Sequence, residues 1–230
     1  MKKSYFSKTD VILWSCSVLT IIISYIISGG NGFLTLIASV LGATSLILNA
    51  KGHPVGQLLM IVFSLLYGII SYSFSYYGEM ITYLGMTAPM AFIAFVSWVR
   101  NPYKGNKSDV KVGRIGKNEF FFMIFLSAVV TFVFYYILKY FGTENMLFST
   151  LSVTTSFIAV YLTFRRSPFF ALAYGLNDVV LIVLWIMASF EKCEYVSVVV
   201  CFFIFLLNDL YGFISWKKRE KIQNNNSEKM

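Results

Sequence analysis

Long apolar runs separated by short polar breaks occupy nearly the whole chain. A helix that crosses a lipid bilayer needs about 20 mostly apolar residues. Eight runs of about this length occur, at Val11–Ser28, Phe33–Ala50, Val55–Tyr76, Met80–Trp98, Glu119–Tyr140, Asn145–Phe164, Pro168–Phe190 and Tyr195–Trp216. The pattern therefore predicts an all-α, polytopic membrane protein with about eight transmembrane helices and no separate soluble domain.

Composition and the position of the charges agree with this prediction. Hydrophobic residues make up 57% of the 230 residues and charged residues only 13%, whereas a typical soluble domain has roughly 25% charged residues. Of the 19 lysines and arginines, 17 lie before the first run or after an even-numbered run: Lys2, Lys3, Lys8, Lys51, Arg100, Lys104, Lys107, Lys111, Arg114, Lys117, Arg165, Arg166, Lys217, Lys218, Arg219, Lys221 and Lys229. Only Lys139 and Lys192 lie on the other side. Because basic residues concentrate in cytoplasmic loops, we expect both termini in the cytoplasm and no nucleic-acid partner.

The start of the chain allows a second interpretation. Met1-Lys2-Lys3 before an apolar run is also the pattern of a signal peptide, but no small-x-small cleavage motif ends the run. We therefore expect Val11–Ser28 to remain as a transmembrane helix.

The two halves of the chain share features that indicate an internal repeat. A proline opens the third helix at Pro54 and the seventh at Pro168, and the fourth and eighth helices both end in Ser-Trp, at Trp98 and Trp216. These matches predict a parallel 3+1+3 repeat, with an accessory helix at 11–28, a first bundle at 33–99, a linker helix at 119–140, a second bundle at 145–216 and a cytoplasmic tail at 217–230. Without a repeat, the two tryptophans are simply anchors at the cytoplasmic membrane interface, which is how we interpret their side chains.

Polar side chains inside the predicted helices are the candidates for a binding site, because such groups are costly in a bilayer and usually face a cavity or a protein interior. The seventh and eighth helices hold the strongest candidates: Asn177, Asp178, Asn208 and Asp209. Aromatic and amide candidates lie on the seventh and third helices: Tyr174, Trp185, Gln57 and Tyr67. Together they predict a central site for a polar, ring-bearing solute, in which amides and carboxylates bind hydroxyls and aromatic rings stack on the solute. The alternative is that these groups only tie helices together.

No enzyme signature is found in the chain. A Walker motif, a His-Glu-x-x-His motif and a Gly-x-Ser-x-Gly motif are all absent. We therefore expect no catalytic residue, no cofactor and no metal, and we expect passive or ion-coupled transport, in which Asp178 and Asp209 could carry a coupling proton. Two other classes stay open: an intramembrane enzyme that uses these two residues as an aspartyl dyad, and a membrane sensor.

Two segments resemble the PnuC family of vitamin and nucleoside transporters. One is Gly78–Met90 and the other is Ser97–Lys107, and the surroundings of Asn177 and Asn208 also match. The resemblance implies a 3+1+3 architecture like that of the SWEET transporters, with the site between the two bundles. Asn177, Asn208 and, less directly, Gln57 are the positions to which the family's binding residues carry over.

The resemblance also implies a function: import of nicotinamide riboside across a bacterial plasma membrane by facilitated diffusion, with a separate kinase that phosphorylates and traps the solute. The aspartate after each asparagine departs from the family pattern, and it suits a solute with a positively charged ring and a sugar diol. Relatives are associated with deoxynucleosides, thiamine or riboflavin, so another nucleoside or vitamin is the alternative substrate. A homo-oligomer is compatible with the sequence.

Overall fold

The computed structural model describes residues 5–27, 29, 32–73, 76–143, 145–190 and 195–227. Its helices are α1 (Lys8–Ile27), α2 (Phe33–Ala50), α3 (Val55–Ser73), α4 (Tyr77–Thr82), the π-helical η1 (Tyr83–Thr87), α5 (Ala88–Arg100), α6 (Lys117–Tyr140), α7 (Met146–Phe164), α8 (Phe170–Ser189) and α9 (Val196–Ser227). Since α4, η1 and α5 form one span, the described residues contain eight helices long and apolar enough to cross a membrane, and the prediction of about eight is confirmed. The basic residues Lys2, Lys3, Lys192 and Lys229 lie outside the described residues.

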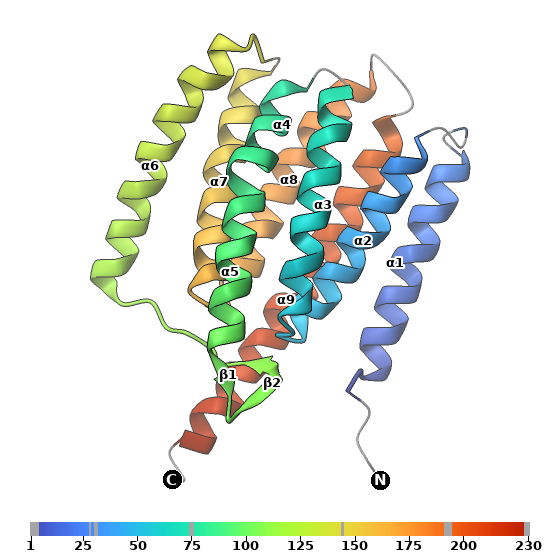
Figure 1. Ribbon diagram of the computed structural model, residues 1–230. Helices are drawn as coiled ribbons and strands as arrows, with labels where there is room; N and C mark the ends of the chain where they lie inside the picture. The colour runs from blue at the N-terminus through green and yellow to red at the C-terminus, as the bar shows by residue number, and fades with distance from the viewer. Residues whose placement is uncertain are drawn as a thin grey trace.

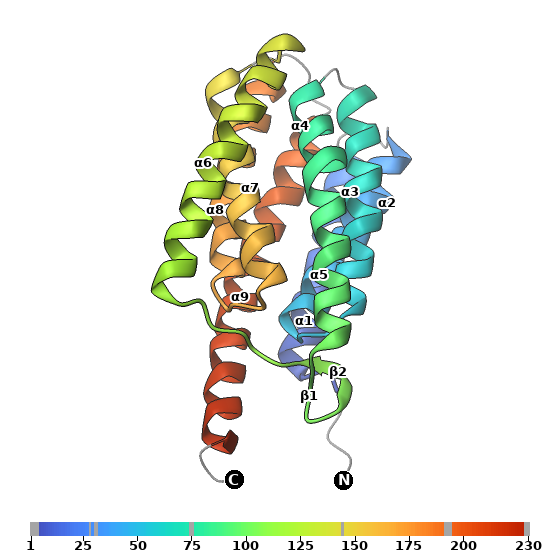
Figure 2. The same cartoon turned by 60° about the vertical axis from the view of Figure 1, so that its left-hand side comes forward.

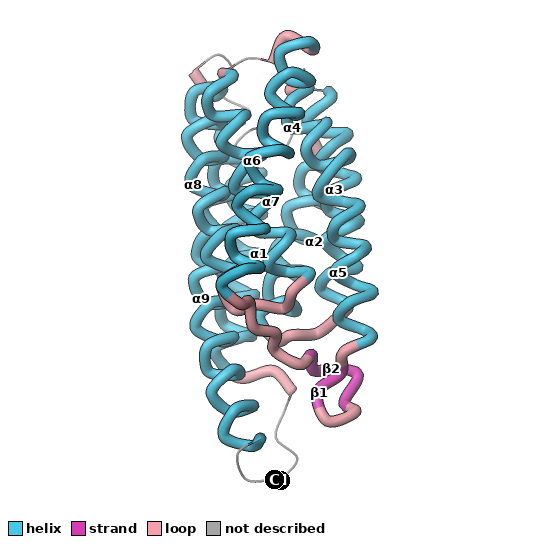
Figure 3. Tube along the Cα trace, turned by 90° about the vertical axis from the view of Figure 1, so that its left-hand side faces the viewer, coloured by secondary structure: helices cyan, strands magenta, loops and turns pink. Residues whose placement is uncertain are grey.

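Six of the eight spans form a closed ring. Around this ring, α2 contacts α3, α3 contacts α5, α5 contacts α7, α7 contacts α8, α8 contacts α9, and α9 returns to α2. The spans run nearly side by side, and both termini and a small hairpin lie at one end of the molecule (Figures 1 and 3). We call this the hairpin end and the opposite end the far end.

The remaining two spans lie outside the ring. Helix α6 packs on α7, and α1 packs on α2 and α9; Figures 1 and 2 show both at the periphery. Only 17% of the apolar window of α1 and of α6 is buried, compared with 39–56% in the other spans. This is the predicted arrangement of one accessory helix, two three-helix bundles and a linker helix.

Equivalent helix ends in the two bundles confirm that the halves repeat. Helices α2 and α7 both run toward the hairpin end, and each is followed by a residue with left-handed backbone, Gly52 (φ 66°) and Arg166 (φ 56°). Such a residue commonly ends a helix, because its N–H can bond back to a carbonyl of the last turn. Here the Gly52 N–H donates to the Asn49 carbonyl and the Arg166 N–H to the Thr163 carbonyl, both at 2.9 Å.

The same two carbonyls receive a bond from the opposite bundle. The Trp216 indole N–H donates to the Asn49 carbonyl at 2.7 Å, and the Trp98 indole N–H donates to the Thr163 carbonyl at 2.9 Å. The last carbonyls of a helix have no partner within the regular helix. Here each of the two carbonyls accepts one bond from the residue that caps its own helix and a second bond from the opposite bundle. Both indoles are 0% exposed and their rings lie 5.3 Å apart. Our interpretation of the two tryptophans as interface anchors is therefore wrong: they join the bundles.

The hairpin end contains more structure than the hydrophobic pattern indicated. The polar segment after α5 forms an antiparallel pair, β1 (Pro102–Tyr103) and β2 (Asn106–Val110). Helix α9 continues past its predicted end to Ser227, because the lysine, arginine, glutamate and glutamine residues at the start of the tail are good helix formers. The Gln223 side chain on this extension bonds the Val110 carbonyl at 3.0 Å and the Val112 N–H at 2.9 Å.

The fourth span contains the irregularity that its proline predicted. Pro89 has no N–H and its ring crowds the preceding turn. The chain responds with the π-helical segment η1, which ends two residues before Pro89. The Thr87 hydroxyl donates to the Thr82 carbonyl at 3.3 Å and so partly replaces the regular ladder. Because π segments are rare and are frequent at functional sites, this span is a candidate for the lining of a site.

The indole hydrogen bonds of Trp98 and Trp216 form what we call the joint between the bundles. Its contribution to stability can be tested by replacing Trp216 with Phe. The variant loses a buried indole donor and part of the ring volume, so the free energy of unfolding should fall by about 1–3 kcal/mol. Thermal unfolding of the purified protein measures this change. Trp14→Phe is the matched control, because Trp14 is 39% exposed and its indole N–H donates to the Thr44 hydroxyl on the neighbouring helix. Equal losses in the two variants would contradict the role of Trp216.

Candidate functional site

A pair of carboxyl groups lies in the middle of the ring. Asp178 comes from the middle of α8 and Asp209 from α9, and the two carboxyl groups are within hydrogen-bonding reach of each other. Each residue is only 4% exposed. Tyr174, one turn before Asp178 on α8, lies within electrostatic range of both carboxyl groups. The structure therefore brings together three of the predicted site residues.

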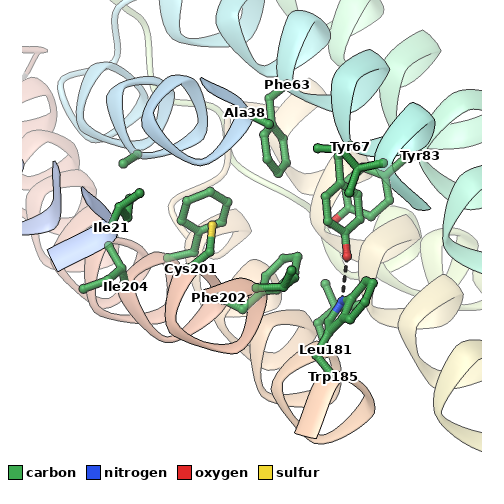
Figure 4. Packing of buried hydrophobic residues seen from close by; sticks show 14 of the residues in the cluster. Ile21, Ala38, Phe63, Tyr67, Tyr83, Leu181, Trp185, Cys201, Phe202 and Ile204 are labelled. Atoms are coloured by element: carbon green, nitrogen blue, oxygen red, sulfur yellow. Dashed lines mark hydrogen bonds between the residues drawn. The ribbon is translucent and has the colours of Figure 1, made fainter. Parts of the chain in front are cut away.

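Aromatic side chains close the far end of this site. The Trp185 indole N–H donates to the Tyr67 hydroxyl at 2.7 Å, which links α8 directly to α3 across the ring (Figure 4). The Tyr67 ring lies 4.4 Å from the Tyr83 ring and 5.5 Å from the Phe202 ring. We call these four side chains the aromatic layer. It includes two predicted site residues, Tyr67 and Trp185.

The hairpin end is closed by a second set of rings. The Trp98 and Trp216 rings lie 5.3 Å apart with an angle of 51° between their planes, and the Phe170 ring lies 5.0 Å from Trp216 and 6.2 Å from Trp98. The carboxyl pair is thus enclosed between two aromatic closures, one at each end.

The predicted amides are placed differently from the carboxylates. The Asn177 side-chain oxygen accepts bonds from Thr155 and Ser156 at 2.8 and 2.9 Å, which ties α8 to α7. Gln57 donates to the Asn49 side chain at 2.9 Å, within the first bundle. The described hydrogen bonds of Asn177 and Gln57 each stay within one bundle. This agrees with the alternative interpretation, in which these amides hold neighbouring helices together.

Asn208 points toward the accessory helix. Its amide nitrogen donates to the Ser17 hydroxyl on α1 at 3.0 Å and to the Ile204 carbonyl at 2.8 Å. Its buried oxygen has no hydrogen-bond partner among the described residues. Asn208 thus connects α1 to the ring and keeps one free acceptor.

Glu79 is a candidate that the sequence analysis missed. We expected the fourth helix to begin at Met80, which left Glu79 in a connecting loop, but α4 begins at Tyr77 and encloses it. The side chain is 1% exposed and lies within electrostatic range of Tyr67 and Tyr83. The sequence feature that indicates a buried Glu79 is its spacing: it lies four residues before Tyr83, at the start of the fourth apolar run.

Several buried polar atoms in this region have no hydrogen-bond partner among the described residues. They include both carboxylate oxygens of Glu79, one carboxylate oxygen of Asp178, and the hydroxyls of Ser64 and Ser152. Buried polar groups are almost always paired, and the cost of an unpaired one is about 1–3 kcal/mol. This unused hydrogen-bonding capacity, contributed by α3, α4, α7 and α8, is what a site for a polar solute provides. No group of three or more His, Cys, Asp or Glu suited to a metal occurs in the described parts of the chain.

A ring of membrane-spanning helices that is built from two repeated bundles, with buried polar groups between them, is the arrangement that many secondary transporters have. Comparison with known proteins identifies the class. The family model described as nicotinamide mononucleotide transporter matches residues 32–218. The chain therefore belongs to the PnuC family of transporters, and it is a transporter and not an enzyme.

Individual relatives agree with the family. The chain is similar to a nicotinamide riboside transporter PnuC of Neisseria mucosa, with 26% identity over 196 residues that cover 83% of this chain and 74% of the relative. It is also similar to a nicotinamide riboside transporter PnuC of Haemophilus influenzae, with 22% identity over 84% of this chain and 83% of the relative. Among solved structures, the crystal structure of the vitamin B3 transporter PnuC has the same fold, with a TM-score of 0.83, 22% identity, and coverage of 95% of this chain and 94% of that one.

The far-end closure can be tested with Tyr67→Phe, which keeps the ring and removes the acceptor of the Trp185 bond. A buried hydrogen bond contributes about 0.5–1.5 kcal/mol, so opening of the aromatic layer should become about two- to tenfold more frequent. Cys201 reports on this opening, because it is 5% exposed and packs in the same cluster. The rate of its modification by a small maleimide, measured in a background with Cys16 and Cys193 replaced by Ser, should rise accordingly.

Tyr72→Phe is the control for this experiment, because Tyr72 lies on the same helix, 61% exposed. An unchanged modification rate in Tyr67→Phe, or an equal rise in Tyr72→Phe, would show that the Tyr67–Trp185 bond does not hold the far end closed.

Proposed function

We propose that this chain imports nicotinamide riboside by facilitated diffusion across a bacterial plasma membrane, with both termini in the cytoplasm. The names of the two relatives support the substrate, and the distribution of basic residues supports the orientation. The observation that carries the proposal is the set of buried polar atoms without partners around Asp178, between two aromatic closures.

The chemistry of the centre suits this solute. A carboxylate accepts bonds from the two adjacent hydroxyls of a ribose, and hydrogen bonds to a charged group are worth about 1.5–3 kcal/mol. Asp178 and Asp209 can supply these acceptors, and the tyrosine rings of the aromatic layer can stack on a planar ring. Residues Asn177, Asn208 and Gln57, to which the family resemblance points, then support this site by fixing the helices that carry it, and Asn208 also offers its free oxygen.

The repeat supports a mechanism in which the two bundles rock about the solute. Parallel repeats related by an axis along the membrane normal commonly place the site at their interface, and transport follows from opening one closure at a time. Such a cycle needs no energy source and stops when the solute concentration is equal on both sides, so continued import requires that the solute is consumed inside. A separate kinase that phosphorylates the ribose would supply this step.

Two alternatives keep the same site. The first is import of another nucleoside or vitamin, such as a deoxynucleoside, thiamine or riboflavin, since an aromatic layer also stacks on their rings. The second is proton coupling, which the carboxyl pair of Asp178 and Asp209 favours because facing carboxyl groups can share one proton.

Uptake into vesicles that contain only the purified protein tests the function. Labelled nicotinamide riboside should enter until its concentration is equal on both sides, and faster than into empty vesicles. Uptake of thymidine, thiamine or riboflavin without uptake of nicotinamide riboside would refute the substrate. Accumulation above equilibrium when a pH gradient is imposed would refute facilitated diffusion and favour the proton-coupled alternative.

The role of the carboxyl pair predicts the effect of Asp178→Asn. Removing the charge weakens the bonds to the ribose hydroxyls, so the initial rate of uptake at low substrate concentration should fall about ten- to hundredfold. Glu220→Gln is the control, because Glu220 forms its salt bridge with Lys217 on the extension of α9, away from the ring. A rate within twofold of the unaltered protein would remove Asp178 from the site.

A further inference from the structure

Glu79 is a buried acid whose position has no structural explanation in the fold. It lies in the first turn of the fourth span, near the far end, and both of its carboxylate oxygens lack a hydrogen-bond partner among the described residues. The Ser152 hydroxyl of α7 is the nearest hydrogen-bond donor to this carboxylate. A hydroxyl has a single O–H, whereas a carboxylate can accept several hydrogen bonds, so a contact with Ser152 still leaves acceptors of Glu79 unused.

No cation of the described chain neutralises this residue. The salt bridges among the described residues join Lys51 to Asp10, Arg165 to Glu119, Lys217 to Glu220 and Arg219 to Asp109. All of these basic partners lie toward the hairpin end, whereas Glu79 lies near the far end (Figure 1). An ionisable side chain inside a membrane protein normally pairs with an opposite charge or marks the path of a solute. The missing partner is therefore expected to be a cation that comes from outside the chain.

The surroundings of Glu79 favour an organic cation. The Tyr67 and Tyr83 rings lie 4.4 Å apart with an angle of 58° between their planes, and Glu79 is within electrostatic range of both. Figure 4 shows these two rings side by side at the edge of the aromatic layer. The face of a tyrosine ring attracts a positive charge. A carboxylate within electrostatic range of two such rings can bind a flat ring that carries a positive charge.

The carboxyl pair and Glu79 are linked through Tyr83. Its hydroxyl is within electrostatic range of both Glu79 and Asp178. Tyr83 is also the first residue of the π-helical segment, which displaces it from regular helical position. Tyr83, a member of the aromatic layer, thus connects the surroundings of the carboxyl pair with those of Glu79.

We propose that Glu79, together with the rings of Tyr67 and Tyr83, forms a subsite that binds the positively charged nicotinamide ring, while Asp178 and Asp209 bind the ribose. This inference rests on the proposed function and adds to it a residue that selects the charge of the solute. Nicotinamide riboside carries a permanent positive charge on its ring nitrogen, so it brings the counter-charge that Glu79 lacks. A neutral nucleoside leaves that carboxylate unpaired, and its import is disfavoured.

Reduced nicotinamide riboside is the probe that isolates the charge. It has the same ribose and the same carboxamide, but its dihydropyridine ring is neutral. Initial uptake rates of the oxidised and reduced forms are measured in vesicles that contain the full chain or its Glu79→Gln variant. The unaltered protein should prefer the oxidised form by about tenfold, and Glu79→Gln should lose this preference while it still imports the reduced form. Glu220→Gln should keep the preference.

The two levels of the proposal fail in different ways. Import of neither form by the unaltered protein would refute the proposed function and this subsite with it. Import of both forms with the same preference in the unaltered protein and in Glu79→Gln would refute the subsite alone.

A second measurement needs no variant and so does not depend on how Glu79→Gln folds. The 1-methylnicotinamide cation has the charged ring without the ribose, and nicotinamide is its neutral counterpart. In the unaltered protein, the cation should inhibit nicotinamide riboside uptake at a concentration about tenfold lower than nicotinamide does. Equal inhibition by the two compounds would overturn the subsite.

Discussion

The lipid bilayer offers no hydrogen-bond partners, and the rest of the structure follows from this constraint. Every polar group inside the membrane is either paired within the protein or costly. The joint between the bundles is one consequence. The last carbonyls of α2 and α7 receive indole donors from the opposite bundle, through Trp216 and Trp98. Two separate three-helix bundles are thereby held as one ring.

The same constraint makes the unpaired groups informative. Asn49, Gln57, Asn177 and Thr155 are all engaged with one another or with neighbouring helices, and they need no further explanation. Asp178 and Glu79 keep carboxylate oxygens without partners at almost complete burial. In a transporter, a solute that alternately enters and leaves can justify this cost, because it completes these bonds only while it is bound. The aromatic closures at both ends then determine when the site is open.

The eight spans and their repeat could be predicted because they depend on features that are local in sequence. Apolar runs of bilayer length define the spans, and Pro54 and Pro168 mark equivalent helix starts. The partners of individual side chains depend on the packing of distant helices, which the sequence does not show. For this reason Trp98 and Trp216 were assigned to the membrane interface although they are buried at the joint, and Asn208 was grouped with Asp209 although its amide faces α1. Glu79 was missed because a boundary error of three residues moved it from a helix into a loop.

The central claim is that the solute lies inside the ring, with its ribose at Asp178 and its charged ring at Glu79. An experimental structure of the protein in lipid with nicotinamide riboside bound tests this claim most directly. Density for the solute is expected between α3, the segment formed by α4 and η1, α8 and α9. The ribose hydroxyls should lie within hydrogen-bonding distance of Asp178 and the nicotinamide ring against Tyr67 and Tyr83. Density in another place, such as the groove between α6 and α7 lined by Thr131 and Thr154, would contradict it.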